Sequence, residues 1–176
     1  LREVLLEEAT NRAEVGDFLD IGTGTGRFLK WLAPHARHAI GVDLSPEALR
    51  IARTAVHGAG LSHCVLQQGD MYALSFPPQS FDLITMGRLL ADAQRPGAAV
   101  REAARVLRPQ GRLAVIEDYD HLETLCSAQG RNALATLRGW LEAAGLECQR
   151  LRPVDAATQH LIVAVGRRRD ALTLAA

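Results

Sequence analysis

The sequence DFLDIGTGTGR at residues 17–27 decides the fold class of this chain. An apolar strand, predicted over residues 17–21, runs directly into three alternating glycines, and Gly26 opens a predicted helix. Glycine lets the backbone of such a turn adopt a positive φ and approach a ligand where a side chain would collide. A second apolar strand ends at Asp43, whose carboxylate could clasp two ribose hydroxyls. We therefore expect a nucleoside-bearing cofactor at the carboxyl edge of a sheet.

The spacing of this turn separates two kinds of nucleoside cofactor. Dinucleotide-binding turns read G-x-G-x-x-G, whereas here the third glycine, Gly26, comes one residue early and Arg27 stands in its place. Asp20 precedes the glycines, and its carboxylate would repel a pyrophosphate but attract an amino-acid ammonium. S-adenosylmethionine carries such an ammonium and no phosphate. The turn favours S-adenosylmethionine, and a dinucleotide-dependent oxidoreductase is the weaker alternative.

Two later segments supply further candidate contacts. A third strand is predicted over residues 64–68, and Asp70 behind it could accept a hydrogen bond from the adenine amine while Met71 packs on the ring. A fourth strand is predicted over residues 81–86. Because ligands of open α/β sheets bind outside the carboxyl ends of the strands, these side chains should surround one site. The residues expected to bind the cofactor are Asp20, Gly22, Thr23, Gly24, Gly26, Asp43, Leu44, Asp70, Met71 and Met86.

Four motifs in this order resemble the class I S-adenosylmethionine-dependent methyltransferases. They read DIGTGTGRF from residue 20, GVDLSPEAL from residue 41, QGDMYALSFPPQSFDLI from residue 68 and EAARVLRPQGRLAVIE from residue 102. The resemblance covers roughly residues 16–118. It implies a Rossmann-like, doubly wound α/β fold whose seven-stranded sheet is mostly parallel, with the last strand antiparallel. It also implies S-adenosylmethionine as methyl donor, S-adenosylhomocysteine as product, and cofactor contacts at the residues named above.

Two kinds of small-molecule methyltransferase are the most similar. Residues 81–111 resemble the ubiquinone/menaquinone C-methyltransferases, although Arg88 here directly follows Gly87, whereas in that group the Arg comes two residues after the Gly. Residues 137–147 extend a resemblance to methyltransferase domains fused behind winged-helix repressors of the arsenic-resistance type. These resemblances imply methyl transfer by in-line displacement to an unidentified small molecule. The alternative is a non-catalytic S-adenosylmethionine-sensing module of a transcriptional regulator.

No catalytic motif stands out, and methyl transfer does not require one. The enzyme mainly aligns nucleophile and methyl group, and it needs a base only where the acceptor must lose a proton. The catalytic residues are therefore unknown, with three candidates near the ends of the fourth and fifth strands: His121 as a general base, Arg88 as a contact for an anionic acceptor, and Asp118. No metal site is expected.

Composition sets the remaining expectations. A chain of 176 residues with zero formal net charge suits a single domain over residues 1–176 that binds no nucleic acid itself. Three cysteines without a CxxC pair suit a reducing cytoplasm, and no apolar run is long enough to span a membrane. The chain begins with Leu1, so we expect a processed product or, preferentially, a fragment of a longer polypeptide.

The remaining elements follow from helix starts and stops. Helices are predicted over residues 26–33, over residues 46–57, from residue 96 or 97 to about residue 107, and over residues 132–144. A fifth strand is predicted over residues 112–117, and final strands over residues 146–151 and 160–165. A loop over residues 118–130 is the one sizeable insertion. The pocket is accordingly expected to be open, closed by a missing segment, or closed by the second subunit of a homodimer.

Overall fold

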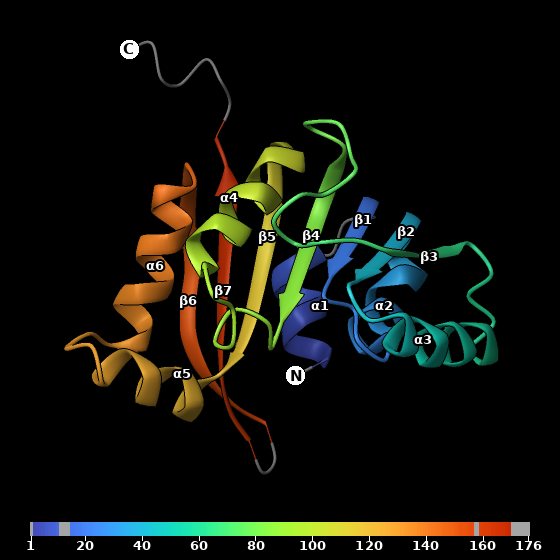
Figure 1. Ribbon diagram of the computed structural model, residues 1–176. Coiled ribbons are helices and arrows are strands. Elements are labelled where there is room, and N and C mark those ends of the chain that lie inside the picture. The colour runs from blue at the N-terminus through green and yellow to red at the C-terminus, as the bar shows by residue number, and fades with distance from the viewer. Residues whose placement is uncertain (1, 11–14, 157–158, 170–176) are drawn as a thin grey trace.

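The computed structural model describes residues 2–10, 15–156 and 159–169, and its strands form a seven-stranded sheet (Figure 1). The strand order is β3-β2-β1-β4-β5-β7-β6, and β7 runs antiparallel to both of its neighbours. The strands are β1 (Val15–Ile21), β2 (Ala36–Asp43), β3 (Cys64–Gln68), β4 (Phe81–Gly87), β5 (Leu107–Asp118), β6 (Leu146–Ala156) and β7 (Gln159–Arg168). The expected doubly wound, mostly parallel sheet with an antiparallel last strand is confirmed.

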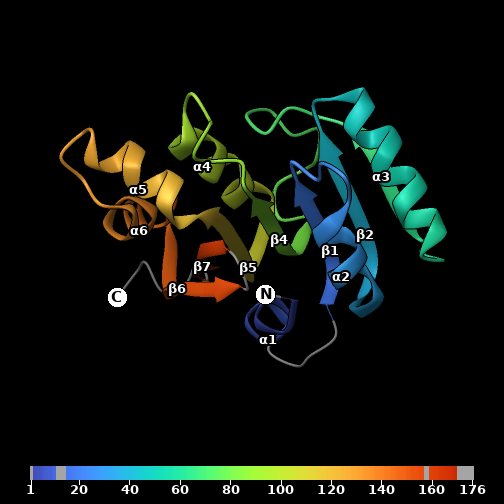
Figure 2. The ribbon, with the colours of Figure 1, turned by 90° about the horizontal axis from the view of Figure 1, so that it is seen from below.

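Helices cover both faces of this sheet. The helices are α1 (Arg2–Thr10), α2 (Arg27–Leu32), α3 (Pro46–Gly58), α4 (Pro96–Val106), α5 (Tyr119–Ser127) and α6 (Ala133–Ala143), with a short 3₁₀ turn, η1 (Ala33–His35), after α2. Helices α4, α5 and α6 lie on one face, and α1 lies on the opposite face (Figure 2). Apolar side chains alternate accordingly along β1: Leu19 packs in the same cluster as α4 and α6, whereas Phe18 packs with α2 and α3.

Local sequence explains where α3 begins. The hydroxyl oxygen of Ser45 accepts a hydrogen bond from Ala48 N at 3.2 Å, which satisfies one of the free N–H groups of the first turn. Pro46 follows at the first helical position, where its missing N–H is harmless. The start of α3 immediately behind Asp43 therefore fixes the backbone around that carboxylate.

The expected loop over residues 118–130 is wrong, because most of it forms α5. The Asp118 carboxylate caps this helix by accepting a hydrogen bond from His121 N at 3.0 Å. Leu122 and Cys126, four residues apart, are buried in the core on one side of the helix. A capping acid followed by two apolar residues at helical spacing was the available signal.

Strand β5 begins earlier than expected. Leu107 pairs with Phe81 of β4, but the next pair joins Arg112 to Leu83, so residues 108–111 of β5 lie opposite the single residue Asp82 of β4. Gln110 adopts a φ of 64° in this stretch, so the chain turns within the strand.

The final hairpin is also longer than expected. Strands β6 and β7 pair with one another from Leu146–Arg168 out to Ala156–Gln159, beyond the point where β5 ends. Main-chain pairing, and not an apolar pattern, sets the ends of these two strands. Among the described residues, no helix is both long and apolar enough to cross a membrane.

Candidate functional site

The glycine turn between β1 and α2 is open on its ligand-facing side. Gly22, Gly24 and Gly26 adopt φ values of 68°, 52° and 78°. A Cβ atom added at Gly24 would meet, among the residues that the structure describes, only the carbonyl oxygen of Gly22, at 3.9 Å, so none of them fills the space above this residue. Thr23 N donates to Val42 O at 2.9 Å and thereby ties the turn to β2. A ligand could approach the exposed main chain at Gly24 closely.

Asp43 at the end of β2 binds the main chain of this turn and the main chain at the start of α3. Its Oδ2 accepts a hydrogen bond from Gly24 N at 2.8 Å, and its Oδ1 accepts one from Ser45 N at 2.9 Å. A carboxylate offers about four acceptor positions, so each oxygen can accept a second hydrogen bond. The Asp43 carboxylate is partly exposed beside the open glycine turn. The arrangement fits two neighbouring hydroxyls of a ribose.

Asp20 lies beneath the turn with no exposed surface. Its Oδ2 accepts a hydrogen bond from Thr23 Oγ1 at 2.7 Å and its Oδ1 accepts one from Thr85 Oγ1 at 2.6 Å. Burial raises the pKa of the Asp20 carboxyl to about 6, against the opposing effect of the two hydroxyl donors. The carboxylate therefore secures the turn from below, and any attraction that it exerts on a ligand ammonium acts through space.

Gly41 in the middle of β2 was not among the expected site residues. A Cβ atom there would lie 2.9 Å from Thr23 Oγ1 and 2.8 Å from the Cδ2 atom of Leu66. Only glycine leaves room for the Thr23 side chain to reach Asp20. A glycine inside a strand often marks such a close approach, so the sequence did carry a signal for it.

The residues expected around adenine lie beside the ends of β2 and β3. Leu44 is 66% exposed, and Gln68 Nε2 donates to its carbonyl oxygen at 3.0 Å. Asp70 is exposed, and its Oδ1 accepts a hydrogen bond from Tyr72 N at 2.8 Å. Met71 is partly buried against the main core. An exposed apolar surface and an acid are thus available on the same side of the glycine turn.

Met86 differs from the other expected contacts. Its side chain has no exposed surface and belongs to the core cluster formed with α4 and α6. A ligand could therefore meet Met86 only through its main chain.

The segment after β4 covers Gly22, the first glycine of the turn, and leaves Gly24 open. A Cβ atom at Gly22 would come within 2.9 Å of the Leu89 side chain, so Leu89 lies directly over this glycine. The buried Glu117 at the end of β5 holds the segment, because its Oε1 accepts hydrogen bonds from Leu89 N at 2.9 Å and Leu90 N at 2.8 Å. Burial raises the pKa of the Glu117 carboxyl. Glu117 was not among the expected site residues; an acid ending an apolar strand was the only signal.

The three catalytic candidates occupy different settings. Asp118 caps α5, which gives its carboxylate a structural role. His121 is exposed, and its Nε2 lies 3.0 Å from Oδ1 of Asp92 in the segment after β4. Arg88 is exposed with a φ of 53°, and its main-chain N donates to Ile116 O at 2.7 Å. The residues that the structure describes contain no group of three or more potential metal ligands.

Comparison with known proteins identifies relatives of this chain. A family model described as a methyltransferase domain matches residues 19–115. The uncharacterized methyltransferase YcgJ of Bacillus subtilis is 34% identical over 116 residues, which are 66% of this chain and 46% of that protein. The demethylmenaquinone methyltransferase of Thermus thermophilus is 39% identical over 121 residues, which are 65% of this chain and 50% of that protein. The chain thus spans about half the length of these curated relatives.

A solved structure shares the fold. The N-methyltransferase NodS of Bradyrhizobium japonicum, crystallised in complex with S-adenosylhomocysteine, superposes with a TM-score of 0.78 at 23% identity. The superposition covers 96% of this chain and 86% of NodS. It extends over almost the whole sheet and both helical layers.

Proposed function

The chain belongs to the methyltransferase domain family, and from this premise we propose that it transfers a methyl group from S-adenosylmethionine to a small-molecule acceptor. The family match and the shared fold confirm two expectations from the sequence: membership of the class I methyltransferases and S-adenosylmethionine as the cofactor. The contact of Asp43 with the open glycine turn carries the proposal. It places two carboxylate oxygens, which can accept hydrogen bonds from ribose hydroxyls, beside exposed main chain.

We assign the parts of the cofactor to residues of the carboxyl edge. Asp43 would bind the ribose hydroxyls, and the glycine turn would hold the methionine moiety, with the buried Asp20 charge below it. Asp70 would accept from the adenine amine while Leu44 and Met71 contact the ring. The cofactor itself supplies a methyl group on a sulfonium. The partial exposure of Asp43 and the exposure of Leu44 and Asp70 support this assignment.

The acceptor would be aligned by the segments after β4 and β5. Glu117 fixes the main chain of Leu89 and Leu90 next to the glycine turn, and such positioning can supply much of the rate of an in-line displacement. His121, oriented by Asp92, would act as the base for an acceptor that must lose a proton. The relative named as a demethylmenaquinone methyltransferase makes demethylmenaquinone the first acceptor to test.

A labelled-methyl assay tests the proposed activity. The chain would be incubated with S-adenosylmethionine carrying an isotopic methyl label and with a panel of demethylmenaquinone, phenols and amines. We expect a labelled product with at least one acceptor, and none with the Asp43→Ala variant. A chain that binds S-adenosylhomocysteine yet labels no member of the panel or of a small-molecule cell extract would contradict methyl transfer.

A further inference from the structure

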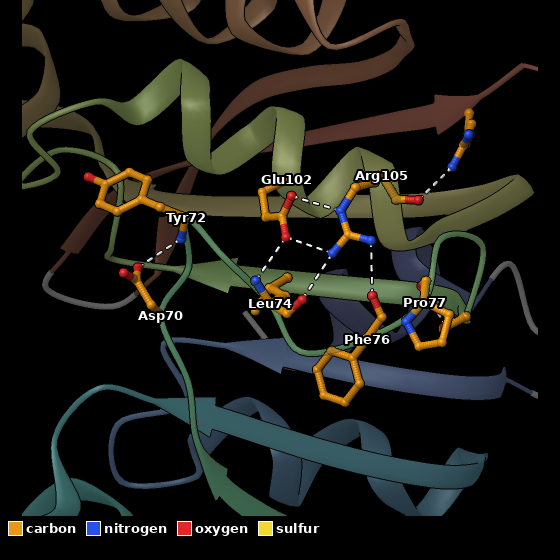
Figure 3. A network of polar contacts seen from close by, with 9 residues as sticks. Asp70, Tyr72, Leu74, Phe76, Pro77, Glu102 and Arg105 are labelled. Atoms are coloured by element: carbon orange, nitrogen blue, oxygen red, sulfur yellow. Dashed lines mark hydrogen bonds and ion pairs between the residues drawn. The ribbon is translucent and has the colours of Figure 1, made fainter.

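The connection between β3 and β4, residues 69–80, is fixed although it contains no helix or strand. It carries Asp70 and Met71, the residues assigned to adenine, and its only regular pairing is a single bridge between Asp70 and Ala73. Side chains from α4 reach across to it (Figure 3). The contacts converge on Leu74, four residues beyond Asp70.

Glu102 and Arg105 of α4 bind both main-chain groups of Leu74. Oε1 of Glu102 accepts a hydrogen bond from Leu74 N at 2.8 Å, and Nη2 of Arg105 donates to Leu74 O at 3.0 Å. The same Nη2 atom donates to Oε1 of Glu102 at 2.7 Å, which closes the ring. In an antiparallel sheet, a neighbouring strand would offer one acceptor and one donor to a residue in this way. The ion pair thus substitutes for a strand partner.

The same arginine holds the next part of the connection. Its Nη1 donates to Phe76 O at 2.9 Å, and Gln79 N donates to the Arg105 carbonyl oxygen at 3.2 Å. The Glu102 side chain is only 15% exposed, and Leu74 is 5% exposed in the main core. Hydrogen bonds from an ionised group are about twice as strong as neutral ones, and partial burial protects these from competing water.

The other end of the connection is tied to the start of α4. Tyr72, whose N donates to the Asp70 carboxylate, accepts a hydrogen bond from Arg95 N at its hydroxyl oxygen, at 3.2 Å. The Arg95 guanidinium also lies 4.8 Å from the centre of the Tyr72 ring. Contacts at two places along α4, at its start and at Glu102 and Arg105, therefore set the position of the short segment that includes Asp70 and Met71.

We infer that Glu102 and Arg105 are positioning residues for adenine recognition, acting through Leu74 to hold Asp70 where it meets the adenine amine. This inference rests on the proposed function, because it needs adenine to bind beside Asp70. Without the pair, the connection would sample other conformations. The apparent affinity for the adenine compound would then fall in proportion to the fraction of molecules whose connection is in the binding-competent conformation.

Titration calorimetry with two nucleosides tests the inference. S-adenosylhomocysteine carries the adenine amine, and S-inosylhomocysteine carries an oxygen in its place. We expect the Arg105→Gln variant to bind S-adenosylhomocysteine about tenfold more weakly than the wild-type chain. Its preference for the adenine compound should shrink towards parity, which a general loss of stability would not cause. Arg105→Lys retains the charge but cannot span Leu74, Glu102 and Phe76 together, so it should show a smaller loss of the same kind.

The chain offers a matched control on α3. Arg50 forms the same pair with Glu47 three residues before it, with Nη2 to Oε1 at 2.7 Å, on an exposed surface. The Arg50→Gln variant should bind both compounds as the wild-type chain does. If Arg105→Gln does not fold, the ratio measured on Arg105→Lys decides the question.

The outcomes separate the inference from the proposed function. A wild-type chain that binds neither compound would overturn the proposed function and the inference with it. A wild-type chain that prefers the adenine compound, with both Arg105 variants keeping that preference, would overturn the inference alone.

Discussion

Replacing Asp43 by asparagine removes one carboxylate oxygen and the negative charge while preserving shape. The remaining amide oxygen can still accept from Ser45 N, but the amide nitrogen would then face the Gly24 N–H, so a donor would meet a donor. The turn would lose its bond to Gly24, and a ribose hydroxyl would lose its charged acceptor.

The expected loss of affinity follows from these contacts. A hydrogen bond to a charged group contributes about 1.5–3 kcal/mol. Losing one such bond to a ribose hydroxyl and weakening a second amounts to about 3 kcal/mol, which corresponds to roughly a hundredfold rise in Kd. The lost contact with Gly24, itself a hydrogen bond to a charged group, should lower the free energy of unfolding by about 2 kcal/mol, which the folded state can tolerate.

Titration calorimetry of Asp43→Asn with S-adenosylhomocysteine measures this loss, and a thermal melt shows that the variant is folded. Asp155→Asn is the control for charge, because Asp155 is an exposed acid on β6 whose side chain is 88% exposed. The control should bind as the wild-type chain does. A folded Asp43→Asn variant whose Kd lies within threefold of the wild-type value would refute the assignment of Asp43 to the ribose.

Three further predictions concern the structure around the turn. Because the folded chain raises the pKa of Asp20 from 3.8 to about 6, this carboxyl stabilises the fold most below pH 3.8, and its contribution is lost as the pH rises through about 6. Urea titrations of the wild-type chain should show the free energy of unfolding falling by up to about 3 kcal/mol between these pH values, and Asp20→Asn should remove this decline. An unchanged decline in the variant would contradict the raised pKa of the buried Asp20 carboxyl. Gly24→Ala should cost about 1 kcal/mol of stability at its positive φ but weaken S-adenosylhomocysteine binding more than about tenfold, because the added methyl occupies the open side of the turn. Equal binding by calorimetry would place the ligand elsewhere. Glu117→Ala should lower the free energy of unfolding by about 2 kcal/mol, because two main-chain donors lose their acceptor, whereas Glu117→Gln should lose less than about 1 kcal/mol. Equal losses for the two variants in denaturant titrations would contradict this role.

The sequence predicted the elements that local signals define. Ser45 and Pro46 marked the start of α3, and the apolar run before Gln68 gave β3 its observed limits. The ends of β6 and β7 could not be predicted in this way, because they depend on the pairing of two polar segments with each other. Helix α5 was missed even though its capping acid and apolar spacing are present, because a loop was assumed after β5.

The site was predictable as a set of strand ends but not as a set of contacts. Asp20 was expected to face a ligand, yet its setting depends on Thr85, 65 residues later in the chain, whose hydroxyl donates to it from the neighbouring strand β4. Gly41 and Glu117 were overlooked for the same reason, since their roles depend on residues of other strands and segments.

The glycine turn and Asp43 together should bind S-adenosylmethionine and not a dinucleotide. Titration calorimetry of the wild-type chain with S-adenosylhomocysteine, and separately with NAD, tests it most directly. We expect saturable binding of S-adenosylhomocysteine with a Kd in the micromolar range, about 8 kcal/mol of binding free energy, and no heat with NAD. Binding of NAD alone, or of neither compound, would contradict it.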